Sequence, residues 1–454
     1  MELTELLRSH EGKTLEFKRD ASSPEPLLRT IAAFANTAGG TLLIGVEDSS
    51  REVRGVVDPL DLVERMTSVI SDGIVPRIVP DIEILPWRRT YVLAVQVYPS
   101  PSRPHHVASR GPERGTYVRV GPTNRIADPA LIEEMKRFAR GDAYDEQPVP
   151  DSSSEDIDFR AASEYFRSVR RLAQRDLKTL QLTTTHQGRE VPTVGGLLLF
   201  GRTQERERRF PDAWIQAGRF VGVDRSRILD QTEIRMHLPG AAQETIEFVE
   251  KHLLRGAQIG RVRREETWNL PPAAVREAVI NAIAHADYAQ RGAPIRVAMF
   301  DDRLEVENPG LLPLGLTVPD LLAGISKLRN RVIGRVFHEL GLIEQWGSGV
   351  QRMTAACRDA GLAGPHFEEL GTRFRVTLSL VKTESPRIGS ADRIILDALA
   401  QSRDAGLSTQ EVARVIQRSV RTARTHLARL VESGHVRVIG SGPQDPQRRY
   451  YSTR

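Results

Sequence analysis

The chain has 454 residues, which corresponds to about three domains of ordinary size. Hydrophobic residues make up 40% and charged residues 27%, both ordinary for a soluble globular protein. No apolar run is long enough to cross a bilayer, so we expect no membrane partner. The single cysteine, Cys357, excludes a disulfide framework and a cysteine-based zinc site, and it favours a cytoplasmic location.

The net charge of +5 is concentrated at one end of the chain. Residues 387–454 contain twelve arginines, no lysine and six acidic residues, so this end has a net charge of +6 and the rest is nearly neutral. A basic end on a neutral body is typical of nucleic-acid binding.

Residues 1–142 are predicted to form a mixed α/β domain, because strand-like and helical patterns alternate along them. The strand-like runs are 41–46, 91–97 and 116–120, and the helical runs are 26–36, 58–72 and 129–140. Residues 143–158 are acidic and contain two prolines and three consecutive serines, which is typical of a linker.

Residues 159–265 are predicted to be a connecting α/β region, and residues 266–382 a further α/β domain. We expect helices over 159–180, 241–254 and from Pro271 onward, strand-like runs over 192–200 and 213–221, a hairpin of 295–300 with 303–307, and a closing strand over 374–380. Thr383 to Gly389 is predicted to link this domain to the basic end, residues 390–454. The fold is therefore predicted to be α+β and multidomain.

The polar residues Glu277, Asn281 and His285 are spaced at i, i+4 and i+8 on one predicted helix, so they share a face. Two glycine turns follow, Asn308-Pro-Gly310 and Trp346-Gly-Ser-Gly349. Magnesium prefers oxygen ligands such as the Asn281 carbonyl, and Glu277 can accept a proton from an attacking water. The pattern indicates a nucleotide–magnesium site, and the alternative is an amphipathic helix with a solvated polar face.

Residues 266–382 resemble a divergent GHKL ATPase domain, an α/β sandwich of the type labelled an ATP-dependent helicase C-terminal domain. The resemblance rests on the stretch from Asn269 to Tyr288 and on the two glycine turns, and it implies ATP and magnesium as cofactors. It implies that Glu277 is the catalytic base and Asn281 the metal ligand, and that nucleotide contacts come from His285, Asn308, Gly310, Arg329, Gly347 and Gly349. Asn308 departs from the aspartate of the typical Asp-x-Gly box. No Gly-x-x-x-x-Gly-Lys-[Ser/Thr] loop occurs in the chain, which excludes a helicase motor.

The stretches 11–18, 33–40 and 43–48 resemble the Schlafen AlbA-like domain, and the resemblance covers roughly residues 5–140. In some Schlafen proteins clustered carboxylates cut RNA. The matching catalytic positions here are Glu11, Glu16, Lys18 and Asp48. The favoured alternative is that these residues are structural parts of a module that binds nucleic acid or protein.

The basic end is predicted to form a winged helix-turn-helix. Ser408-Thr-Gln-Glu411 is a capping box, Ser419 begins a further helix that ends near Glu432, and a hairpin follows around a Gly440–Pro443 turn. Side chains early in the last helix are placed to reach the major groove of double-stranded DNA, and wing arginines to meet phosphates. The predicted DNA-binding residues are Arg421, Thr422, Arg424, Thr425, Arg448 and Arg449. A winged helix used for protein contact is the alternative.

The sequence therefore predicts an ATP-binding, DNA-binding transcriptional regulator, and two half-sites on DNA would suit a homodimer. One alternative is a metal-dependent nuclease that acts on RNA and is gated by nucleotide. The other is an interaction scaffold with a vestigial nucleotide fold. Whether ATP is hydrolysed or only bound stays open.

Overall fold

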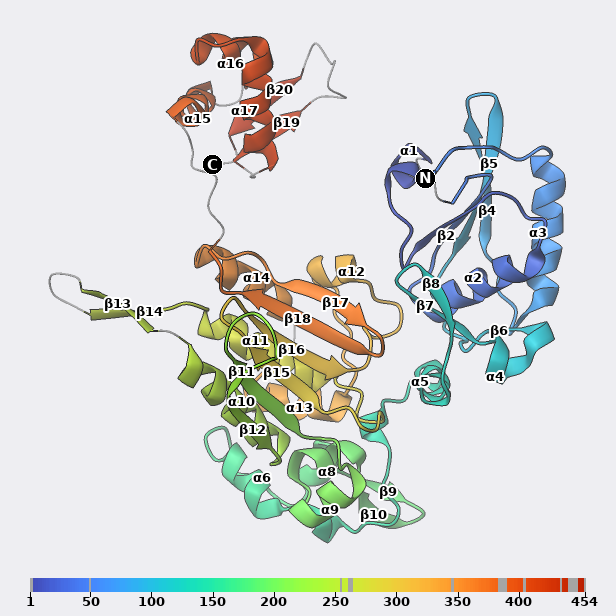
Figure 1. Cartoon of the computed structure of the whole chain (residues 1–454). Coiled ribbons are helices and arrows are strands. Elements are labelled where there is room, and N and C mark those ends of the chain that lie inside the picture. The colour runs from blue at the N-terminus through green and yellow to red at the C-terminus, as the bar shows by residue number, and fades with distance from the viewer. Residues whose placement is uncertain are drawn as a thin grey trace. The chain divides into compact units, whose positions relative to one another are not determined.

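The computed structural model describes residues 3–48, 50–253, 255–259, 264–343, 347–382, 390–402, 406–432, 435–439 and 448–452. Trp346, the predicted linker Thr383–Gly389 and the predicted turn Gly440–Pro443 lie outside them. The chain divides into two compact units, Met1–Val381 and Lys382–Arg454. Helices and several separate sheets are present, which confirms the predicted α+β multidomain fold (Figure 1). Among the described helices, none has both the length and the apolar character needed to cross a membrane.

The N-terminal part of the first unit is built around a four-stranded sheet. Its elements are α1 (Leu3–Arg8), β1 (Leu15–Lys18), α2 (Pro24–Asn36), β2 (Gly40–Ile44), α3 (Pro59–Gly73), β4 (Asp81–Trp87) and β5 (Thr90–Val97). The strand order is β1-β2-β5-β4, with β1 parallel to β2 and the other pairs antiparallel. Because side chains alternate along a strand, Leu42 and Ile44 pack against α2 and α3, while Leu43 packs on the side of α1.

Smaller elements complete this part of the unit. They are β3 (Ile74–Val75), β6 (His106–Val107), α4 (Gly111–Gly115), β7 (Tyr117–Val120), β8 (Thr123–Ile126) and α5 (Pro129–Arg140). Asn36, at the end of α2, donates from Nδ2 to the carbonyl oxygens of His105 and Tyr117, each at 2.8 Å. These hydrogen bonds attach the segments that contain His105 and Tyr117 to α2.

The segment predicted as a linker, residues 143–158, is packed against the elements that follow it. It contains two 3₁₀ turns, Tyr144–Glu146 and Ser154–Asp156. Val149 donates its N–H to the Pro192 carbonyl at 2.9 Å, and the Val149 side chain is buried in the same core as the following elements. Residues 143–158 therefore form a segment packed against the following elements rather than a flexible linker.

The next elements are α6 (Phe159–Phe166), α7 (Asp176–Thr179), β9 (Thr183–His186), β10 (Arg189–Pro192), α8 (Val194–Phe200), α9 (Thr203–Arg209), β11 (Ile215–Phe220), β12 (Ile228–Ile234), α10 (Leu238–His252), β13 (Arg255–Ile259) and β14 (Arg264–Trp268). The run 192–200 was predicted to be strand-like at least in part, but only Pro192 belongs to a strand, β10, and most of the run forms α8. Its start is capped by Thr193, whose Oγ1 accepts from Gly196 N at 2.9 Å. All seven residues of α8 are buried, so apolar periodicity could not separate a helix from a strand.

The last part of the first unit contains α11 (Pro272–His285), β15 (Ile295–Met299), β16 (Arg303–Pro309), α12 (Val318–Leu322), α13 (Arg331–Glu339), α14 (Gly349–Asp359), β17 (His366–Leu370) and β18 (Arg373–Ser379). One six-stranded sheet has the order β12-β11-β15-β16-β18-β17, and Figure 1 shows it from green β11 to orange β18. Since β11 pairs in parallel with β15, the predicted boundary near residue 266 falls inside one sheet. Helix α11 packs against α10, α14 and β16.

The second unit has three helices followed by an antiparallel strand pair. Its elements are α15 (Ser390–Ser402), α16 (Thr409–Val415), α17 (Val420–Glu432), β19 (Val436–Ile439) and β20 (Arg449–Ser452). Ser408 and Glu411 form the predicted reciprocal capping box, with Ser408 N donating to Glu411 Oε2 at 2.7 Å. Leu399, Val412, Leu427 and Tyr450 are buried together in its core.

Candidate functional site

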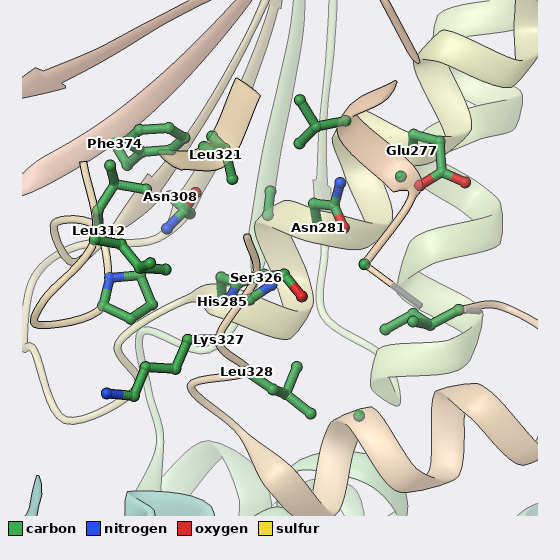
Figure 2. A pocket seen from close by; sticks show the side chains of 18 of the residues that line it. Glu277, Asn281, His285, Asn308, Leu312, Leu321, Ser326, Lys327, Leu328 and Phe374 are labelled. Carbon is green, nitrogen blue, oxygen red and sulfur yellow. The ribbon is translucent and has the colours of Figure 1, made fainter. Parts of the chain in front are cut away.

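A cavity of about 430 Å³ opens beside α11 in the first unit, and Figure 2 shows side chains around it. Its walls come from α11, the ends of β16 and β18, the segment 311–328, α13 and α14. Six of the predicted site residues line it, namely Glu277, Asn281, His285, Asn308, Gly347 and Gly349. The two glycine turns and the α11 face are therefore brought to one place.

Helix α11 positions three of these side chains because its other positions are committed to the core. Pro272 stands at its first position, and Val279, Ile280 and Ile283 are buried among core side chains. The polar residues lie one turn apart on the remaining face, and Figure 2 shows Glu277, Asn281 and His285 on one helix along the cavity.

His285 lies at the inner end of this row. Its Nδ1 atom is buried and has no hydrogen-bond partner in the described part of the chain. Burial, aided by the nearby Arg329 guanidinium, lowers the pKa of His285 to about 4. The imidazole is therefore neutral near pH 7 and can accept or donate one hydrogen bond without adding charge.

Glu277 lies at the other end and forms an ion pair that the sequence did not reveal. Its Oε1 is 2.5 Å from Nη2 of Arg352, in the first turn of α14. A Cβ placed on Gly349 would lie 2.4 Å from Glu277 Oε2, so only glycine lets α14 start so close to the carboxylate. The interval Gly349-Val-Gln-Arg352, one turn into a helix after a glycine turn, was the sequence clue to this arginine.

Asn308 lies at the end of β16, where Figure 2 shows it beside Leu312 and Phe374. Its Nδ2 donates to the Pro309 carbonyl oxygen at 2.9 Å, and this contact fixes which way the amide points. Its Oδ1 is then the group left to accept a hydrogen bond from a ligand.

Gly310 and Arg329 are not among the described residues that line this cavity. Gly310 has φ of +96°, and a Cβ there would lie 2.8 Å from Arg329 Nη1. Arg329 donates from Nη2 to the Leu311 carbonyl at 2.6 Å, and its Nη1 is 2.8 Å from Glu134 Oε1. Both residues hold the 311–330 segment in shape behind the cavity wall.

The cavity also has a basic side that the predicted site residues did not include. Lys327, Arg331, Arg335 and His338 line it, three of them from α13. The start of α13 is held by Asp145, whose carboxyl oxygens accept the N–H groups of residues 331–333 at 2.7–2.9 Å. Burial raises the pKa of Asp145 to about 7, although these three N–H groups lower it. A residue of the predicted linker thus positions one wall of the cavity.

The acidic residues of the N-terminal part are only partly brought together. Glu16 is buried and forms ion pairs with Lys18 Nζ at 2.6 Å and with the fully buried Arg119. Glu11 accepts from Phe17 N at 2.6 Å and lies beside Asp48. Burial, opposed by the Phe17 N–H and aided by Asp48 and Glu16, raises the pKa of Glu11. In the described ranges, no three His, Cys, Asp or Glu side chains are grouped so that they could hold a metal ion.

The predicted DNA-binding residues lie in the second unit. Arg421, Arg424 and Thr425 are exposed on α17, and Thr422 is partly exposed. Arg448 lies over the Tyr450 ring at 5.5 Å, and Arg449 Nη1 is 3.1 Å from the Gly406 carbonyl. The α17 arginines are therefore open to solvent, whereas the two strand arginines also contact their own unit.

Two family models match the chain. Residues 11–128 match the model for "Schlafen, AlbA_2", and residues 292–378 match the model described as "Putative ATP-dependent DNA helicase recG C-terminal". The chain contains a Schlafen AlbA_2 domain and a RecG-type ATPase-like domain. The second match includes Asn308, Gly347 and Gly349, whereas Glu277 and Asn281 precede it.

Solved structures with similarity to the chain include two from bacteria. The DIP2311 protein from Corynebacterium diphtheriae is 23% identical, with a TM-score of 0.45, and the match covers 92% of this chain and 87% of that one. The N-terminal domain of a RecG-related protein from Nitrosomonas europaea is 24% identical, with a TM-score of 0.23, and the match covers 27% of this chain and 88% of that one. No curated protein matches the chain at a significant level.

Proposed function

We propose that the chain is an ATP-binding, DNA-binding transcriptional regulator whose nucleotide state switches its nucleic-acid-binding parts. The observation that carries the proposal is the cavity of about 430 Å³ in which a carboxylate, two carboxamides and a glycine turn meet. Cavities of this size, mostly apolar with a few convergent polar groups, are typical of small-molecule sites.

The apolar end of the cavity suits a purine base. Leu312, Leu321 and Phe374 surround Asn308 there, as Figure 2 shows. Because the Asn308 amide keeps its Oδ1 for a ligand, it can accept from the amino group of adenine. The carbonyl of guanine at the same place would meet a second acceptor, so the site favours ATP over GTP.

The middle of the cavity suits a magnesium ion. Asn281 lines the cavity from α11, and its amide has no hydrogen-bond partner in the residues described here. It can therefore supply one neutral oxygen ligand, while phosphates and waters supply the rest. The ion, when bound, would neutralise phosphate charge. Glu277, which pairs with Arg352 and lines the same cavity, is proposed to accept a proton from water.

Since the chain has no phosphate loop of the motor type, ATP binding serves to change conformation rather than to drive strand separation. We propose that nucleotide closes the Leu311 to Trp346 segment over the cavity and that closure reorients domains or pairs two subunits. The AlbA_2 domain and the second unit are the parts proposed to contact nucleic acid.

The second unit is proposed to act as a winged helix, with α17 in the major groove. In a gel-shift series, ATP with magnesium should change the affinity of the wild-type chain for duplex DNA. Arg421→Ala with Arg424→Ala should weaken binding and reduce the salt slope by roughly one per lost phosphate contact. Duplex binding that ignores both ATP and this double substitution would refute the proposal.

The nuclease alternative is favoured by one observation, the contact between Glu11 and Asp48. The ion pairs of Glu16 with Lys18 and Arg119 weigh against a three-carboxylate site. Purified protein with manganese should then cut structured RNA, and Glu11→Ala with Asp48→Ala should abolish cutting. Equal cutting by the double variant would remove this alternative.

A further inference from the structure

Helix α13 presents three basic side chains to the cavity while its other side is buried in the core. Val332, Val336 and Phe337 are fully buried. The cavity-lining residues Arg331, Arg335 and His338 follow the i, i+4, i+7 spacing of one helical face. The basic row is therefore a built wall of the cavity, held in place by the packing behind it.

The three basic residues differ in how their charges are satisfied. Arg331 donates from Nη1 to the Gly141 carbonyl at 2.7 Å and lies 3.2 Å from Glu146 Oε2. Arg335 is half-buried, yet within the described part of the chain its guanidinium makes no hydrogen bond or ion pair. A partly desolvated guanidinium with no partner is costly, so Arg335 is the group that gains most from an anionic ligand.

Backbone anion sites beside the cavity are already taken. The N–H groups at the start of α13 donate to Asp145, and the start of α14 lies against the Glu277 carboxylate. Helix starts often bind phosphate, but here protein carboxyl groups occupy or border both positions. Phosphate charge in this cavity must then be met mainly by side chains, and α13 supplies them.

We infer that Arg335 binds the terminal phosphate of ATP, so that the site distinguishes ATP from nucleotides with fewer phosphates. This inference rests on the proposed nucleotide site and assigns its base end to Asn308 and its phosphate end to α13. A guanidinium donates two parallel hydrogen bonds to phosphate oxygens, a geometry that a lysine cannot reproduce. His338, less than one turn farther along α13, can donate one more.

The test is calorimetric titration of the full chain with ATP, ADP and AMP, each with magnesium. Arg335→Gln should weaken ATP binding by roughly 10- to 100-fold, because a hydrogen bond to a charged group contributes about 1.5–3 kcal/mol. ADP affinity should fall less, and AMP affinity should change by less than about twofold. Arg335→Lys should lose less ATP affinity than Arg335→Gln because it keeps the charge.

Two controls separate the outcomes. Arg358→Gln, at an exposed position of α14 outside the cavity lining, should bind all three nucleotides like the wild type. The unfolding midpoint of Arg335→Gln without nucleotide should be no lower than that of the wild type, since Arg335 has no partner to lose among the described residues. Equal losses for ATP and AMP, or no loss for ATP, would overturn the inference alone. Failure of the wild type to bind any of the three would refute the proposed function itself and this inference with it.

Discussion

Two carboxylate–arginine pairs in this chain differ in what surrounds them. In the AlbA_2 domain, Glu16 pairs with Arg119, whose side chain is 0% exposed and also donates to Gly12 O at 2.9 Å. Beside the cavity, Glu277 of α11 pairs with Arg352 of α14, whose side chain is 34% exposed. The first pair is enclosed and stabilises the fold, whereas the second leaves a carboxylate facing space that a ligand can fill. An acidic residue in a matching motif can act on a ligand only where the fold leaves a cavity beside its carboxylate.

The largest effect is expected from breaking the enclosed pair. Arg119→Met should lower the free energy of unfolding by about 3–5 kcal/mol, because it leaves Glu16 buried without its main partner. Urea denaturation measures this directly. Lys18→Met is the matched control, because Lys18 is 27% exposed and its loss should cost far less. Similar losses in the two variants would show that the Arg119 pair is not a special support of the fold.

A smaller effect is expected from His285, which is partly buried and lines the cavity. Above pH 6.5 the His285 imidazole is neutral in both the folded and the unfolded chain. Below pH 6.5 the unfolded chain binds a proton at this imidazole, whereas the folded chain binds one only near pH 4, because burial lowers the pKa. The unfolding free energy should therefore fall by about 3 kcal/mol as the pH falls from 6.5 to 4, through this residue alone.

The measurement is the unfolding free energy against pH for the wild type and His285→Gln. The variant should show a flatter curve between pH 6.5 and 4. His338→Gln, at an exposed histidine of α13, is the matched histidine-to-glutamine control. A His285→Gln curve parallel to that of the wild type would contradict the assigned burial.

The smallest change in stability and the clearest change in ATP binding are expected from Asn281, which lines the cavity. Asn281→Ala should alter the unfolding free energy by less than about 1 kcal/mol, since its amide faces the cavity. Magnesium-dependent ATP affinity should fall by roughly tenfold or more. Urea denaturation measures the unfolding free energy, and ATP titrations with and without magnesium measure the magnesium-dependent affinity. A variant that binds magnesium-ATP like the wild type would remove Asn281 from the metal site.

Local features of the fold were predictable because neighbouring residues determine them. The hairpin of β15 and β16 and the Ser408–Glu411 capping box were both foreseen. Helix α8 was not, since a fully buried run carries no periodic pattern. The parallel pairing of β11 with β15 joins residues about eighty positions apart, and no local pattern encodes such a contact.

The candidate site was predictable along α11 and less so elsewhere. Glu277, Asn281 and His285 line the cavity because one helix face carries all three. The partner Arg352 and the wall residue Arg335 come from helices whose packing against α11 is a tertiary property. Glu16 carried a catalytic motif, but the arginine that neutralises it lies about a hundred residues later in the chain.

We propose that the cavity beside α11 binds ATP and that Glu277 acts there as the general base. The most direct measurement is magnesium-ATP binding and turnover by the wild type and by Glu277→Ala. We expect that both proteins bind one ATP per chain and that any phosphate release by the wild type is lost in the variant. No binding by the wild type at millimolar ATP, or unchanged phosphate release by Glu277→Ala, would contradict it.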